Sequence, residues 1–174
     1  MSPISWRLYD CPAMMISVVG GDPAPPEVLA QAEALGRELA RRGCTIVCGG
    51  RGGVMEAACR GAKKAGGITV GILPSADGRD VNRYVDVMIT TGMGYARNSI
   101  VVSSADAVIA INGSTGTLSE IGMALNFEKP VVVVEGSGGI ADKIKESFKE
   151  DGRIRKIVKS SAEGAVKASL DCIK

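Results

Sequence analysis

The residues best suited to chemistry lie at 112–120, NGSTGTLSE, directly after the apolar run AVIAI. A helix beginning near Thr117 would expose unpaired backbone N–H groups at its first turn, and its dipole would favour an anion there. Glycines let such a loop approach a phosphate closely, and neighbouring hydroxyls add hydrogen-bond donors. The candidate phosphate-binding residues of this stretch are Gly113, Ser114, Thr115, Gly116 and Thr117.

Glu120 closes the same stretch and has two interpretations. Thr117 and Glu120 have the spacing of a capping box, in which the carboxylate accepts a hydrogen bond from the backbone N–H of Thr117. Alternatively, the carboxylate faces the bound ligand and takes part in chemistry. The residues alone leave both interpretations open, but a phosphate site at the loop does not depend on the choice.

Two further glycine clusters follow apolar runs, at 20–21 and at 49–53. The second, in GGRGGVMEAA, is neither a dinucleotide fingerprint nor a Walker loop, because Met55 stands where a small residue is needed and no Gly-Lys-Ser/Thr occurs. Arg51 either reaches a phosphate or is simply solvated. The ligand-binding candidates from these clusters are Gly20, Gly21, Gly50, Arg51, Gly52 and Gly53.

Arg97, in the segment GMGYARNSI, is predicted to lie in the first turns of a helix. A cation is electrostatically unfavourable there, so its presence asks for an anionic partner. Glu120 begins the next predicted helix after the next strand and is a plausible partner. We therefore expect Arg97 and Glu120 to form a pair beside the phosphate loop, where it could orient a phosphorylated sugar.

The composition excludes several classes of function. Histidine is absent, which removes Ser-His, Cys-His and His-metal schemes, and we expect no metal site. A net charge of +2 with 3% aromatic residues gives no reason to expect nucleic acid or a membrane surface as partner. The five cysteines are odd in number and form no CxxC, so we expect reduced thiols and a cytoplasmic protein.

Glycine is the compositional outlier, with 23 of 174 residues against a usual share of roughly 7%, and most glycine clusters follow apolar runs. Short apolar runs alternate with helical patterns from residue 14 onward, which predicts a single Rossmann-like domain at 14–174 after an N-terminal arm at 1–13. The fold class is α/β, a doubly wound parallel sheet of six to seven strands with helices on both faces. The predicted strands are 15–20, 44–50, 68–74, 85–90, 106–112, 130–136 and, at an edge, 155–159.

Three of the glycine clusters therefore lie at strand carboxyl ends, where ligands bind in such sheets. The three turns, at 20–21, 49–53 and 113–116, can meet on one rim of the sheet and hold a phosphate there. The longest polar stretch, 75–86, is either a lid that sets specificity or a plain solvated connection.

The order of GGRGGVMEAA, YARN and GSTGTLSE resembles the SLOG superfamily over residues 15–174. It is similar to the Lonely Guy phosphoribohydrolases, to relatives once labelled possible lysine decarboxylases, and to molybdenum cofactor carrier proteins. In the hydrolases a P-G-G-x-G-T-x-x-E motif binds the ribose phosphate. This chain keeps Glu120 of that motif but has Asn112 for proline and Ser114 for glycine; Arg97 matches the arginine of the family's M-H-x-R-K stretch, whose methionine, histidine and lysine are absent.

The resemblance implies two alternative functions. The first is hydrolysis of the N-glycosidic bond of a nucleoside 5′-monophosphate to a base and ribose 5-phosphate, with Arg97 and Glu120 as the catalytic residues. The second is a non-catalytic carrier or sensor of a nucleotide or molybdenum cofactor. Either implies a small phosphorylated ligand, nucleotide-like or molybdopterin-like, no required cofactor, and a homodimer or larger homo-oligomer. A pyridoxal-phosphate decarboxylase is disfavoured, because the sequence singles out no Schiff-base lysine.

Overall fold

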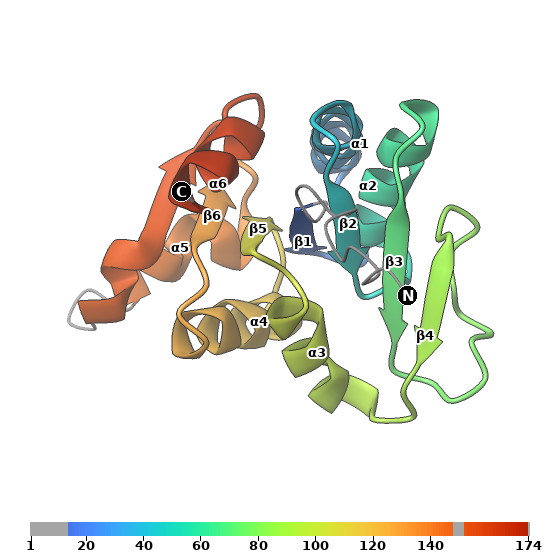
Figure 1. Ribbon diagram of the computed structural model, residues 1–174. Coiled ribbons are helices and arrows are strands. Elements are labelled where there is room, and N and C mark those ends of the chain that lie inside the picture. Colours follow the sequence, from blue (N-terminus) through green and yellow to red (C-terminus); the bar gives the residue numbers. More distant parts are fainter. Residues whose placement is uncertain (1–13, 148–151, 174) are drawn as a thin grey trace, which may run out of the picture.

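The computed structural model describes residues 14–147 and 152–173, so the predicted arm at 1–13 lies outside the described residues. Seven parallel strands form one sheet in the order β4-β3-β2-β1-β5-β6-β7 (Figure 1). This confirms the predicted Rossmann-like α/β class. The strands are β1 Met15–Gly20, β2 Thr45–Cys48, β3 Thr69–Leu73, β4 Val87–Thr90, β5 Ala107–Ile111, β6 Val131–Val134 and β7 Ile157–Ser160.

Helices cover both faces of the sheet. The α-helices are α1 Pro26–Arg41, α2 Gly53–Lys64, α3 Asn98–Ser103, α4 Thr115–Asn126, α5 Gly139–Ser147 and α6 Ala165–Ile173, and the 3-10 helices are η1 Gly94–Arg97 and η2 Gly152–Lys156. One buried apolar cluster joins α1, α2 and α6 to the sheet, and a second joins α3, α4 and α5. Successive side chains of a strand point to opposite faces, so Val18 packs in the first cluster and Val19 in the second.

The strand order reverses at β1, which pairs with β2 on one side and with β5 on the other. The chain connections leave β2 and β5 in opposite directions at this point, which opens a crevice outside their carboxyl ends. The loops after β1, β2 and β5 carry three of the glycine clusters. The topology therefore places the predicted binding loops around one crevice.

Helices α1 and α2 pack at very short range on the first face. A Cβ atom on Gly36 would lie 2.0 Å from the backbone oxygen of Ala58, and one on Gly61 would lie 1.9 Å from that of Glu33. The Glu33 carboxylate lies between the helices and pairs with Arg60 at 2.8 Å and Lys64 at 2.6 Å. Because Gly36 and Gly61 have no side chains, the two helices can pack closely, and the ion pairs of Glu33 hold them together. Helix α2, which follows the glycine loop 49–53, is thereby fixed in position.

Edge strand β4 is exposed although its sequence is apolar. It lies at the outer end of the sheet (Figure 1), and Val87, Met88 and Ile89 are each more than 40% exposed. A sheet edge with apolar side chains open to water is a surface that usually needs cover.

Among the described residues, no helix is long and apolar enough to cross a lipid bilayer.

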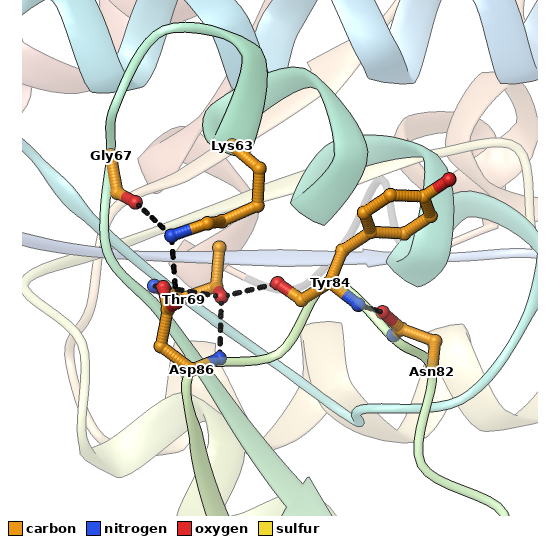
Figure 2. A network of polar contacts seen from close by, with 6 residues as sticks. All are labelled: Lys63, Gly67, Thr69, Asn82, Tyr84 and Asp86. Atoms are coloured by element: carbon orange, nitrogen blue, oxygen red, sulfur yellow. Dashed lines mark hydrogen bonds and ion pairs between the residues drawn. The ribbon is translucent and has the colours of Figure 1, made fainter.

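A polar network fixes the segment that leads into β4 (Figure 2). Lys63 at the end of α2 pairs with Asp86 at 2.6 Å, and Asp86 accepts hydrogen bonds from the backbone N–H and the hydroxyl of Thr69 at the start of β3. The Thr69 hydroxyl also lies 2.6 Å from the Tyr84 carbonyl, and the Tyr84 N–H bonds the Asn82 side chain at 3.0 Å. Residues 82–86 are therefore held by α2 and β3.

Candidate functional site

Helix α4 begins at Thr115, two residues earlier than the sequence suggested, and its N-cap is Ser114. No side chain caps this end, and the first intrahelical bond at this end runs from the Leu118 N–H to the Ser114 carbonyl at 2.9 Å. The N–H groups of residues 115–117 therefore have no partner within the helix. This end of α4 has the geometry and the partial positive charge that bind an anion.

The turn before α4 is anchored on its far side. Asn112 and Gly113 both have positive φ, 57° and 87°, and their carbonyls accept the N–H groups of Ala141 and Ile140 in α5. The Gly113 N–H is bonded to the Asn112 side chain at 2.6 Å, and a Cβ on Gly113 would lie 2.2 Å from the Thr117 hydroxyl. Gly113 shapes the turn and makes room for Thr117, but it does not line the cavity described next.

A cavity of about 820 Å³ lies in the crevice at the carboxyl ends of β1, β2 and β5. Its wall contains residues from all three glycine turns, together with residues from η1, α3 and α4. The lining residues are Val18, Val19, Gly20, Gly21, Asp22, Gly49, Arg51, Met55, Tyr95, Arg97, Asn98, Ser114, Thr115, Gly116, Thr117, Ser119 and Glu120.

Besides Gly113, three predicted binding glycines lie outside this wall. A Cβ on Gly50 would lie 2.9 Å from the Leu73 side chain, and one on Gly53 would lie 2.3 Å from the Gly21 carbonyl. Gly52 faces Asp22 in the same way. The Gly21 carbonyl also accepts the Val54 N–H at 2.9 Å. Gly50, Gly52 and Gly53 are therefore needed for close packing between the loops, whereas Gly49 and Arg51 face the cavity.

Arg97 and Glu120 meet inside the cavity, 23 residues apart in the chain. Arg97 Nη1 lies 3.6 Å from Glu120 Oε1, and the two side chains are only 8% and 9% exposed. Arg97 ends η1 instead of opening an α-helix, and its guanidinium lies over Gly49, where a Cβ would come within 2.7 Å of two of its nitrogens. Arg97 is therefore buried by contact with the glycine loop, not solvated.

The guanidinium of Arg97 is under-bonded. Its Nε and Nη1 atoms are buried and have no hydrogen-bond partner among the described residues, because Glu120 is too distant for a hydrogen bond. A buried N–H without a partner costs on the order of 1–3 kcal/mol, and more when the group is charged. An anionic or polar ligand in the cavity would supply the missing acceptors.

Burial is the largest cause of the pKa shifts of Glu120 and Arg97. It raises the pKa of Glu120 from 4.5 to about 7, and the nearby Arg97 cation only partly opposes the rise. Burial likewise lowers the pKa of Arg97, against the attraction of Glu120. Glu120 is therefore close to half-protonated near neutral pH, which suits a group that exchanges a proton with a bound water or ligand.

The capping interpretation of Glu120 is wrong for this chain. Thr117 is the third residue of α4, not its N-cap, and no side-chain hydrogen bond caps that helix. Glu120 lies one turn further along and faces the cavity and Arg97.

Several cavity residues escaped the sequence reasoning. Asp22 follows the first glycine pair, and Tyr95 lies two residues before Arg97 with its side chain 79% exposed at the rim. The Asn98 amide donates to the Ser119 hydroxyl at 3.0 Å, which ties α3 to α4. Asp22 and Tyr95 could have been found from their adjacency to predicted residues, but the contact between Asn98 and Ser119 has no sequence signal.

The polar stretch 75–86 contributes nothing to the cavity wall, so it is not a lid in this structure. The Asn82 amide instead donates to the carbonyls of Gly50 and Arg51, at 3.1 and 2.9 Å, and Asp80 lies 3.5 Å from Arg51. The stretch supports the glycine loop 49–53 from behind. Of the two alternatives left open by the sequence, it is therefore the connection, exposed or half-buried over most of its length but with Asn82 buried against the glycine loop.

A doubly wound parallel sheet with a cavity at its switch point defines a Rossmann-like α/β protein, a fold in which ligands commonly bind at this position. The model of the SLOG cluster4 family matches residues 13–166, and the chain belongs to this family. The molybdenum cofactor binding protein of Rippkaea orientalis is 38% identical, with a TM-score of 0.85 over 94% of this chain and 99% of its own.

Two further proteins are similar to this chain. The molybdenum cofactor carrier protein of Chlamydomonas reinhardtii is 33% identical, with a TM-score of 0.80 over 92% of this chain and 98% of that one. A cytokinin riboside 5′-monophosphate phosphoribohydrolase of Mycobacterium tuberculosis is 32% identical over 125 residues, covering 67% of each chain. The predicted resemblance to both kinds of protein is thereby confirmed.

Proposed function

We propose that this protein binds a phosphorylated, nucleotide-like ligand, with the phosphate at the N-terminus of α4. The single observation that carries the proposal is the buried Arg97 guanidinium, with two unpartnered nitrogens, in the same cavity as the open helix end. Both features favour an anion, and their side-by-side position is costly unless something occupies the cavity. The cavity volume of about 820 Å³ is in the range that holds cofactor-sized ligands.

Carrying the ligand unchanged is the first form of this function. Similarity to the molybdenum cofactor binding and carrier proteins extends over nearly the whole chain, and a molybdopterin-like ligand carries the phosphate that the helix end favours. A carrier needs tight binding only, so Arg97 and the α4 end suffice. In this form the protein requires no further cofactor.

Hydrolysis of a nucleoside 5′-monophosphate is the second candidate, and Glu120 favours it. With a pKa of about 7, Glu120 is partly ionised at neutral pH, and the carboxylate can take a proton from water as the oxygen bonds to the ribose C1′. The bond from C1′ to the base breaks in the same step, and the departing base takes up a proton from solvent. The ionised carboxylate would also stabilise positive charge on the ribose in the transition state. Arg97 would hold the carboxylate and the sugar in position, since phosphate anchoring alone does not accelerate the reaction.

One experiment tests the shared binding step and separates the two forms. The protein is titrated calorimetrically with AMP, with inorganic phosphate and with molybdopterin, and the AMP mixture is then assayed for free adenine. Binding without adenine release supports a carrier, whereas release that is lost in Glu120→Gln supports the hydrolase. Glu38→Gln, on the exposed side of α1, is the matched control and should match the parent protein. Failure of AMP, phosphate and molybdopterin alike to bind would refute the proposal.

A second copy of the chain is the partner that we infer for β4. Val87, Met88 and Ile89 of edge strand β4 are exposed apolar residues, as is Met93 at the start of η1. Homo-oligomers are what the family resemblance implies. Light scattering after size exclusion should therefore give at least a dimer, and Met88→Asp should dissociate it. Phe127→Asp, an equally exposed apolar position after α4, is the control.

The four free cysteines described fit a reducing, cytoplasmic setting.

A further inference from the structure

Three sulfur atoms lie behind the glycine loop, and of the three residues only Met55 also lines the ligand cavity. Cys48 ends β2, and Met55 and Cys59 lie four residues apart on one face of α2. The Sγ atoms of Cys48 and Cys59 are 3.5 Å apart, both thiols are free, and both side chains are fully buried. Met55 packs with them in a small cluster of its own, separate from the two main cores.

The surroundings of the pair differ from those of an ordinary buried thiol. The Gly50 N–H donates to Cys48 Sγ at 3.3 Å, and the Arg97 guanidinium lies over the neighbouring Gly49. The contact with Cys59, followed by the Gly50 N–H and Arg97, lowers the pKa of Cys48 despite its burial, whereas the same contact, together with burial, raises the pKa of Cys59. Cys44, also buried but in the main core, shows the usual behaviour, since burial raises its pKa.

We propose that Cys48, Cys59 and Met55 form a site for a soft monovalent metal ion, Cu(I). Thiolate and thioether sulfurs are the ligands that select Cu(I), and three of them here come from two rigid elements. Metal–thiolate bonds of roughly 2.3 Å hold two sulfurs about 3.8 Å apart at a tetrahedral angle. The observed 3.5 Å separation is within a few tenths of an ångström of that value.

Zinc fits this site less well. A structural zinc ion takes four ligands from cysteine, histidine and carboxylates, and no group of three or more such residues gathers anywhere in the described ranges. The chain contains no histidine. Three sulfurs without a fourth ligand therefore favour Cu(I), which accepts low coordination numbers.

The proposed Cu(I) site has a neighbouring counter-charge and a route by which the ion can enter. Binding releases the two thiol protons to solvent, and two thiolates with one Cu(I) leave one negative charge, which the adjacent Arg97 cation balances. Met55 and Gly49 line the cavity, so an ion can reach the thiols past Met55 from that side. The site requires neither phosphate binding nor catalysis, and the inference is independent of the proposed function.

A chelator competition tests the site. Protein reduced under nitrogen, in a Cys11→Ser/Cys172→Ser background, is titrated with Cu(I) held by bathocuproine disulfonate. We expect one Cu(I) per chain to transfer to the protein, and X-ray absorption to show a shell of sulfur alone. Cys48→Ser and Cys59→Ser should each weaken binding at least 100-fold, whereas Cys44→Ser, a buried thiol outside the cluster, should bind like the parent.

Met55→Leu keeps the test decisive if a cysteine variant fails to fold. Leucine preserves the volume of the side chain but removes the thioether, so the variant should fold and bind Cu(I) at least tenfold more weakly. No transfer to the folded background protein would overturn the proposal. So would a metal shell containing oxygen or nitrogen, or transfer that persists unchanged in folded Cys48→Ser or Met55→Leu.

Discussion

The Arg97 guanidinium and the Glu120 carboxylate lie 3.6 Å apart inside the cavity, which is within the range of an ion pair but beyond hydrogen-bond distance. Each group loses solvation on burial, and neither recovers it fully from the other. The pair can therefore accept a third polar group as a hydrogen-bond partner. An anion on Arg97, or a water between the two groups, would supply hydrogen-bond partners for Arg97 Nε and Nη1.

Replacing Arg97 by methionine should weaken binding of AMP at least tenfold, because charge-assisted hydrogen bonds to a buried guanidinium are lost. Arg97→Lys should recover only part of the affinity, since lysine keeps the charge but not the planar set of donors. Isothermal titration gives the dissociation constants. Arg79→Met, at a side chain that is 87% exposed, is the control and should bind like the parent. Equal affinity in Arg97→Met would contradict the assignment of Arg97 to the ligand site.

Glu120 should make the unliganded protein less stable as the pH rises through neutrality. Its pKa is raised from 4.5 to about 7, so the folded state holds a proton that the unfolded state has released. The contribution of Glu120 to the free energy of unfolding then falls between about pH 4.5 and 8, by on the order of 1–3 kcal/mol.

Urea unfolding of the parent and of Glu120→Gln across this range checks the effect. The difference between the two proteins should change with pH in the stated direction, because glutamine cannot ionise. A difference that stays constant from pH 5 to 8 would mean that the Glu120 pKa is not raised.

Glu33 should stabilise the protein at neutral pH and lose this effect in acid. Hydrogen bonds from Lys64 and Arg60 lower its pKa from 4.5 to about 2. Its contribution is therefore fully present above about pH 4.5 and is lost as the pH falls towards 2. Since both partners are partly exposed to solvent, we expect about 1–2 kcal/mol, less than the full shift implies. Glu33→Gln should be less stable than the parent at pH 7 and should approach it near pH 2, as measured by thermal unfolding.

The close crossing of α1 and α2 should make Gly36 intolerant of a side chain. A Cβ there would lie 2.0 Å from the Ala58 carbonyl, so Gly36→Ala must separate the helices and should cost at least about 2 kcal/mol of stability. Gly122 in α4 is the matched control, because a Cβ there meets nothing within 4 Å. Gly122→Ala should be neutral or stabilising by about 0.5–1 kcal/mol, as alanine favours the helix. Urea midpoints of both variants test the pair, and equal destabilisation would refute the packing argument.

The seven strands and the position of the glycine turns were readable from the sequence. Short apolar runs ended by glycine, separated by helical patterns, are local signals, and each strand was found within a few residues. The parallel sheet then follows from connection rules, which bring the carboxyl ends of β1, β2 and β5 to one rim. The exposure of β4 was missed because an apolar run carries no information about whether a helix covers it.

Within the site, the sequence supplied the residue types and the tertiary structure decided their roles. The glycine clusters, Arg97 and Glu120 could be named beforehand, but only the packing separates Gly49, which faces the cavity, from Gly50, which faces Leu73. The contact between Cys48 and Cys59 likewise depends on how α2 sits on β2. Secondary structure follows from neighbours in the chain, whereas burial, pKa and side-chain contacts depend on elements far apart in sequence, which only the folded sheet brings together.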